Sequence, residues 1–207
     1  MLHATTNALY AYWNEVRGER IAPRRFDIEP SQLGTMLSET FILEDDGTGP
    51  AIFRLAGTKV CDNFGREFRG TRFADLFAED TRAAIAAHLE DVRIHGAVQV
   101  LEVTSGPDAK RAVNFEILLL PLIHSGTKIS RILGTIVAVD PPQWLGSERL
   151  PVLTVLRQER MWPEGRPHAT LEKFRNQPAL IPELAGARLI RVNRRSFRIL
   201  DGGLHKG

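Results

Sequence analysis

The stretch ILGTIVAV, residues 132–139, decides the fold of this chain. All of its residues except Gly134 and Thr135 are apolar, at odd and even positions alike. Successive side chains of a strand point to opposite faces of a sheet, and a sheet with one solvated face alternates apolar and polar residues. This strand lacks that alternation, so we expect it to be covered on both faces.

The residues before this stretch predict the rest of a sheet. Strand patterns run over residues 98–104, 111–120 and 129–139, and turn-forming residues separate them, which predicts an antiparallel three-stranded meander. Further upstream, two strand-like segments, 40–44 and 51–56, flank the sequence DDGTGP and predict a β-hairpin.

Helical patterns lie between and before these strands. Residues 58–78 hold recurring phenylalanines and glycines and predict several short helices, whereas a longer helix begins at Asp80 and ends at Gly96. A first helix is expected over residues 7–17, with Thr6 as its cap. A short helix is expected over residues 31–37. The first helix is the natural cover for the outer face of the sheet, in its own chain or in a partner chain.

Composition favours one ordinary domain with an attachment. The chain has 207 residues, of which 43% are hydrophobic and 25% charged, and a formal charge of +2. Residues 1–150 carry a net charge of −4 and residues 151–207 carry +6, which indicates an interaction tail. We expect an N-terminal helix and connector (1–38), a core (39–142), and a linker with a basic tail (143–207).

Several classes of protein are excluded or disfavoured. The single cysteine excludes an internal disulfide framework and a multi-cysteine metal site, and no metal site is predicted. No apolar run reaches the length of about 20 residues that spans a bilayer, and no secretory signal is visible, so we expect a cytoplasmic protein. The acidic pairs at 45–46 and 79–80 suit a turn and a helix start. No set of nucleophile, base and oxyanion donors is recognisable, so no enzyme is predicted.

The order of these elements, with several short motifs, resembles that of PAS domains. A hairpin, short helices, one longer helix and a meander follow one another within about 100 residues. The motifs are YW at 12–13, PR at 23–24, RLAGT at 54–58, FGRE at 64–67, RG at 69–70 and DLF at 75–77. Over residues 7–142 the chain resembles a family of short, stand-alone bacterial PAS proteins.

This resemblance implies an α+β fold with a five-stranded antiparallel sheet and helices packed on one face. Such domains bind small molecules or cofactors between sheet and helices, dimerise, or relay signals, and they are not usually catalysts. The expected function is that of a sensor or adaptor that acts on another signalling protein and has no output domain of its own.

A ligand pocket and a filled hydrophobic core are both consistent with the apolar residues between helices and sheet. The candidate pocket residues are Phe53, Leu55, Phe64, Phe68, Leu76, Ile85, His88, Leu89, Phe115 and Ile117. A haem- or flavin-binding sensor is an alternative, with His88 before His95 as the candidate haem ligand. Cys61 lacks the NCRFLQ motif of flavin-binding light sensors, which favours a buried structural cysteine. No specific motif indicates a cofactor.

Two segments are candidates for contacts with partners. Leu9, Trp13 and Val16 share one face of the first helix, which is either an internal cap or the interface of a homodimer. The basic run at 187–198, within a possible helix or strand at 189–200, could bind an acidic partner, anionic lipid or nucleic acid. A nucleic-acid-binding regulator is therefore the second alternative, and a solvated basic edge is the plainer interpretation.

Overall fold

The stretch that the sequence predicts to be covered on both faces lies in one of the two central strands of the sheet. The structure is a computed structural model, and it describes residues 1–165 except 2, 46, 107, 109, 110 and 164. Within these residues a six-stranded antiparallel sheet has the order β2-β1-β5-β4-β3-β6. The strands are β1 (Thr40–Glu44), β2 (Ile52–Ala56), β3 (Val98–Ser105), β4 (Val113–Ile123), β5 (Ile129–Val139) and β6 (Thr154–Met161).

The predicted hairpin and meander are confirmed. β1 pairs with β2 across the predicted turn, and β4 pairs with both β3 and β5. The α+β fold class is confirmed as well. The residues at 189–200, expected as a helix or strand, lie outside the described part of the chain.

The sheet has one strand more than predicted. β6 pairs with β3 over residues 154–161, a segment expected to belong to a linker. The core therefore extends past residue 142. The sequence of β6, TVLRQERM, is mostly polar, and most of its residues are exposed. An edge strand can remain polar because only one of its two edges and part of its faces are covered, which is why its pattern was not recognised.

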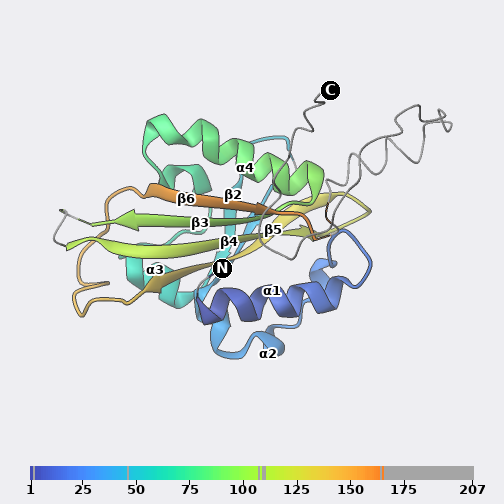
Figure 1. Cartoon of the computed structure of the whole chain (residues 1–207), viewed down its shortest axis with the longest axis horizontal. Coiled ribbons are helices and arrows are strands. Elements are labelled where there is room, and N and C mark those ends of the chain that lie inside the picture. Colours follow the sequence, from blue (N-terminus) through green and yellow to red (C-terminus); the bar gives the residue numbers. More distant parts are fainter. Residues whose placement is uncertain (2, 46, 107, 109–110, 164, 166–207) are drawn as a thin grey trace, which may run out of the picture.

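Helices cover both faces of the sheet, as the apolar stretch at 132–139 predicts (Figure 1). The helices are α1 (Ala4–Arg17), α2 (Pro30–Leu33), α3 (Thr58–Phe64) and α4 (Arg82–His95), with 3-10 turns at 25–27, 34–39, 73–76 and 79–81. α3, α4 and the turn at 73–76 cover one face, and α1 and α2 cover the other. The predicted short helix at 31–37 is thus α2 followed by a 3-10 turn, and the predicted longer helix is α4.

α1 is an internal cap of its own sheet. Leu9 and Trp13 are completely buried, and the indole Nε1–H of Trp13 donates a hydrogen bond of 2.9 Å to the carbonyl oxygen of Pro121 in β4. Val16 is half-buried in the same cluster. Leu9, Trp13 and Val16 are covered by the sheet of the same chain, which is the internal-cap alternative for this face.

α1 also begins earlier than expected. Its N-cap is His3, whose Nδ1 accepts a hydrogen bond from the backbone N–H of Thr5 at 3.1 Å. Thr6, the predicted cap, is fully buried inside the helix. The helix ends at Arg17, and Gly18 follows with φ 57°, a conformation that favours glycine. The burial of α1 starts one turn before the predicted boundary because it packs along β4 and β5.

Gly134 in β5 permits a close approach between strand and core. A Cβ atom at this position would lie 2.3 Å from the carbonyl oxygen of Leu118 and 2.3 Å from Cζ of Phe41. Both distances are far below van der Waals contact. Two residues of the stretch 132–139 are therefore not apolar side chains. One is Gly134, which packing requires, and the other is Thr135, which is fully buried.

Replacing Trp13 tests the cap directly. We expect Trp13→Ala to lower the free energy of unfolding by about 3–5 kcal/mol, because it leaves a cavity and an unpaired carbonyl. Urea denaturation followed by circular dichroism measures this change. The control is Phe26→Ala, at a side chain that is 79% exposed, which we expect to change stability by less than about 0.5 kcal/mol. Similar losses in the two variants would contradict the assignment.

Candidate functional site

Most of the predicted pocket residues meet in one buried cluster between the sheet and the helices α3 and α4. The predicted members that it contains are Phe53, Phe64, Phe68, Leu76, Ile85, Leu89, Phe115 and Ile117. Leu55 does not belong to it, because this residue of the edge strand β2 is 43% exposed. His88 is only half-buried on α4 and is not a member either. The structure thus places Leu55 at the surface and outside this cluster.

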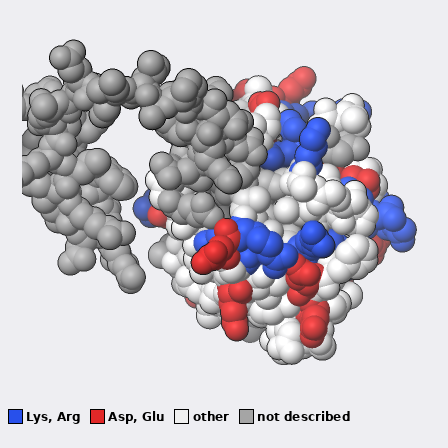
Figure 2. All heavy atoms as spheres, turned by 90° about the vertical axis from the view of Figure 1, so that its right-hand side faces the viewer, with Lys and Arg blue, Asp and Glu red and all other residues white. Residues whose placement is uncertain are grey.

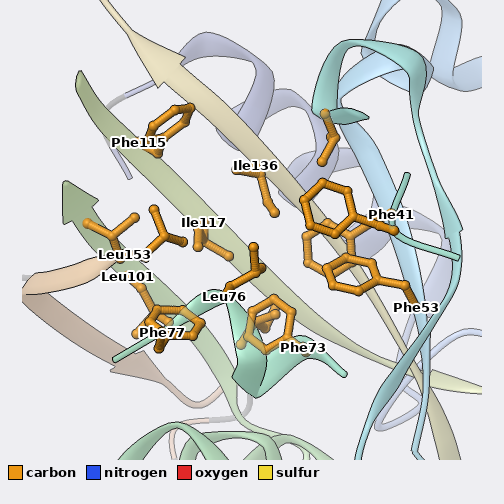
Figure 3. Close-up of a cluster of buried hydrophobic side chains, with 14 of the residues drawn as sticks. Phe41, Phe53, Phe73, Leu76, Phe77, Leu101, Phe115, Ile117, Ile136 and Leu153 are labelled. Atoms are coloured by element: carbon orange, nitrogen blue, oxygen red, sulfur yellow. The ribbon is translucent and has the colours of Figure 1, made fainter. Parts of the chain in front are cut away.

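Phenylalanine rings pack against one another through this cluster. Ring centroids lie 4.9 Å apart for Phe53 and Phe68, 5.1 Å for Phe64 and Phe115, and 5.5 Å for Phe41 and Phe53. Figure 3 shows several of these side chains converging between the strands and the short helical turns. Such contacts are those of a packed aromatic core. The phenylalanine part of the cluster is therefore structural, and a polar ligand would find no partner among these rings.

The same face of β3 carries two buried polar side chains, Ser105, which donates to the carbonyl oxygen of Pro151, and Gln99. Gln99 in β3 is 1% exposed. It points to the same face of the strand as Leu101, a member of the hydrophobic cluster. Its neighbours across the sheet are Leu119 of β4 and Arg160 of β6. Neither Oε1 nor Nε2 of Gln99 has a hydrogen-bond partner among the described residues. Buried amides are nearly always hydrogen-bonded, so this one requires an explanation.

Arg160, the cross-strand neighbour of Gln99, contacts side chains of α4 and of the residue that follows β6. Arg160 donates through Nη1 to Oδ2 of Asp91 on α4 at 2.5 Å. The same guanidinium lies 5.3 Å from the ring centroid of Trp162, whose ring meets that of His95 at 6.4 Å. The Nδ1 atom of His95 is buried and has no hydrogen-bond partner among the described residues. We call these five residues, Asp91, His95, Gln99, Arg160 and Trp162, the Gln99 site.

Local structure explains how the site forms. α4 ends at His95, and Gly96 adopts the left-handed conformation with φ 66°, which turns the chain directly into β3. His95 and Gln99 are therefore four residues apart at one end of the helix–sheet interface. β6 then brings Arg160 and Trp162 beside them from a distant part of the sequence.

The chemistry of the site is that of hydrogen bonding at an apolar boundary. The amide of Gln99 supplies both a donor and an acceptor, and His95 supplies a further ring nitrogen. Trp162 offers an aromatic ring beside them. A small planar molecule with a donor and an acceptor next to each other, such as an amide or a heteroaromatic ring, matches this set of groups.

Sequence reasoning missed this site, although one signal was present. Gln99 interrupts an apolar strand between Val98 and Val100, at a position that shares a face with Leu101. A polar residue on the apolar face of a strand is informative. Arg160 and Trp162 could not be found in this way, because β6, which contains Arg160 and ends just before Trp162, was not predicted.

The charges on the described surface are mixed. Figure 2 shows basic and acidic side chains interspersed on the end of the molecule that it displays. Ion pairs of the described residues include Arg20–Asp27 at 2.6 Å and Arg131–Glu44 at 3.0 Å. This face gives no support to nucleic-acid binding, which uses a surface of one sign. The basic run at 187–198 lies outside the described residues.

The described residues offer neither a metal-binding cluster nor a membrane-spanning helix. No group of three or more histidine, cysteine, aspartate or glutamate side chains is placed there so that it could hold a metal ion. In the same part of the chain, no helix combines the length and apolarity needed to cross a membrane.

Cys61 is buried in the middle of α3. Its thiol donates to Oε2 of Glu67 at 3.7 Å. Burial raises the pKa of Cys61, and the neighbouring Glu67 carboxylate raises it further. A thiol with a raised pKa holds less of the reactive thiolate at a given pH. These surroundings fit a structural cysteine.

We expect Cys61 to react slowly with a thiol reagent. At pH 8 the native chain should react at least about tenfold more slowly than the chain in denaturant, because burial limits both access and ionisation. Raising the pH should increase the native rate. Absorbance of the released thiolate measures the reaction, and Ser31→Cys, at an exposed position of α2, provides a fast internal standard. Equal rates at the two positions would contradict this description.

Comparisons with known proteins agree with this fold. Residues 1–137 match the profile of a PAS domain family. No curated protein matches the sequence. Among solved structures, the LOV protein of Rhodobacter sphaeroides has 16% identity and a TM-score of 0.38, and the match covers 50% of this chain and 60% of that one. Two variants of that LOV protein have 17% and 14% identity, TM-scores of 0.38 and 0.36, and cover 51% and 50% of this chain and 63% and 60% of theirs.

The matched structures thus share part of their length with this chain. The family match is broader, because it runs from α1 through most of β5 and includes the predicted hairpin, the helices and the meander. The chain belongs to the PAS domain family.

Proposed function

We propose that this protein is a sensor or adaptor that binds a small molecule at the Gln99 site and changes its contact with another signalling protein. The observation that carries the proposal is the buried amide of Gln99, whose two polar atoms have no hydrogen-bond partner among the described residues. PAS domains form a sensor-type fold. Fold alone supports function weakly, so the proposal depends on this side chain.

An energetic argument supports a ligand. Burying a polar group without a hydrogen bond destabilises a protein by about 1–3 kcal/mol. A leucine of similar size would avoid this cost, because Gln99 has Leu101 and Leu119 as its apolar neighbours. A molecule that bonds to both amide atoms would recover the lost interaction. This gain would favour ligands with a matching donor and acceptor over purely apolar ones.

The groups at the site support binding rather than catalysis. The amide of Gln99 neither gives up nor accepts a proton near neutral pH, and the Arg160–Asp91 pair is engaged in a hydrogen bond. His95 is the one titratable residue of the site apart from that pair. We therefore propose a binding protein and not an enzyme.

The surroundings of Gln99 also suggest a route for a signal. A ligand beside Gln99 would contact Arg160 or Trp162, the residues through which β6 meets α4. Arg160 lies near the end of the edge strand β6, and Trp162 directly follows that strand. A ligand that displaces the Arg160–Asp91 hydrogen bond would change how β6 is held, and thereby the surface that a partner meets.

Replacing Gln99 by leucine separates stability from binding. Without ligand, we expect Gln99→Leu to raise the free energy of unfolding by about 1 kcal/mol, because the unpaired amide is removed. The same change should abolish the thermal stabilisation caused by planar amides and heteroaromatic compounds, for which nicotinamide and adenine serve as first probes.

Thermal unfolding with and without each compound measures both effects. Gln32→Leu, at an exposed position of α2, is the matched control and should keep the response of the natural sequence. A Gln99→Leu protein that is less stable than the control and still responds to the compounds would contradict the proposal. An absorption spectrum with haem or flavin bands would instead support the cofactor-binding alternative.

A further inference from the structure

The two edges of the sheet differ in how they are covered. At the β2 edge, the backbone N–H of Phe53 donates to the oxygen of Thr71 at 2.9 Å, and Gly70 donates to the oxygen of Phe53 at 2.8 Å. The segment at 70–73 thus pairs with the first part of that edge, at residues 51–53. β6, at the other edge, pairs with β3 alone among the described strands.

The outer edge of β6 is accessible. The strand runs over Thr154–Met161 without a proline, with a β-bulge at Leu156, and residues 156–160 are exposed. Leu156 is 58% exposed and Val152, just before the strand, is 47% exposed. Proteins usually shorten, cover or interrupt such an edge, because its unpaired N–H and C=O groups can pair with another chain.

We propose that the outer edge of β6 binds a second copy of this chain, antiparallel and with twofold symmetry about Gln158. A twofold axis perpendicular to the sheet requires one residue to lie opposite itself. Centring on Gln158 pairs Arg157 of one strand with Glu159 of the other, and the β-bulge of β6 at Leu156 limits the regular pairing to the residues after it. This register joins the two sheets into one.

Charge selects this register. With Gln158 at the centre, Arg157 lies opposite Glu159 of the partner subunit, and the symmetric pair forms as well. Glu159 is exposed, and it has no ion-pair partner among the described residues. Opposite charges at directly facing positions of two strands are stabilising, whereas like charges are destabilising. The sequence of the strand is therefore complementary to itself.

Neighbouring registers are less favourable because they place like charges opposite each other. An axis at residue 157 places Arg157 opposite its own copy, and an axis at residue 159 does the same for Glu159. Within its own chain, Arg157 already donates through Nη1 to Oε1 of Glu102 at 3.3 Å. In the proposed register its guanidinium lies between two carboxylates, that of Glu102 and that of Glu159 of the partner subunit.

This interface replaces the face of α1, which is buried against the sheet of its own chain. It does not depend on the Gln99 site, so the two proposals can fail separately. Arg160 and Trp162 nevertheless lie at the end of the same strand, and a ligand at the Gln99 site would act close to the interface.

The first test measures association of the full chain. Sedimentation equilibrium at low ionic strength should detect a dimer. Glu159→Arg, which places arginines opposite arginines at both symmetric positions, should weaken dimerisation at least about tenfold. Glu19→Arg makes the same change of charge at an exposed residue after α1 and should leave the dissociation constant unchanged.

The second test determines the register. In the proposed dimer, Gln158→Cys places two cysteines opposite each other, whereas Thr154→Cys places them at opposite ends of the paired strands. A short bis-maleimide should cross-link the first variant rapidly and the second hardly at all. The natural chain, whose single cysteine is the buried Cys61, reports the background.

Three outcomes would overturn the proposal. They are a chain that stays monomeric at every concentration, a dimer that Glu159→Arg weakens no more than Glu19→Arg does, and equal cross-linking at positions 154 and 158. The second and third would assign the dimer to another surface. Far-ultraviolet circular dichroism of each variant confirms that β6 and the rest of the sheet are still folded.

Discussion

The burial of β4 and β5 on both faces is the constraint on which the rest of the structure depends. Among the residues of β4, only Asn114 is exposed. Two covering layers are therefore required, and the chain supplies α1 and α2 for one face and the short helices with α4 for the other. The hydrogen bond of Trp13 to Pro121 anchors the first layer, and the contacts among phenylalanine rings hold the second. Because apolar burial is the main stabilising force, neither layer is dispensable.

Within this apolar framework, polar groups at buried positions are informative. Gln99 is the clearest, because it lies on the same face as the packed phenylalanines and has no hydrogen-bond partner among the described residues. It is also close to the edge of the sheet, where β6 meets α4 through Arg160 and Asp91. The proposed binding site and the proposed interaction surface thus lie side by side. This arrangement would let the occupancy of one influence the strength of the other without a movement of the central strands.

The sequence predicted the elements whose patterns are strong and local. The turn at 45–50 marked the hairpin, the alanines before Gly96 marked α4, and the apolar run at 132–139 marked the central strand. β6 was missed because an edge strand has few buried positions and therefore little periodicity. The face of α1 was recognised, but its partner was not. Leu9 and Trp13 would look the same in a sequence whether they met their own sheet or a second chain.

The sequence by itself determined the class of the fold and the need for two covering layers, because apolar periodicity reports burial directly. It also placed the core phenylalanines. Only the tertiary structure decided which surfaces meet. It covered Leu9 and Trp13 with their own sheet, removed Leu55 from the interior, and brought Arg160 and Trp162 beside Gln99 and His95. The physical reason is that a pattern along the chain shows that a side chain is buried, whereas its neighbours depend on strand order and register between distant segments.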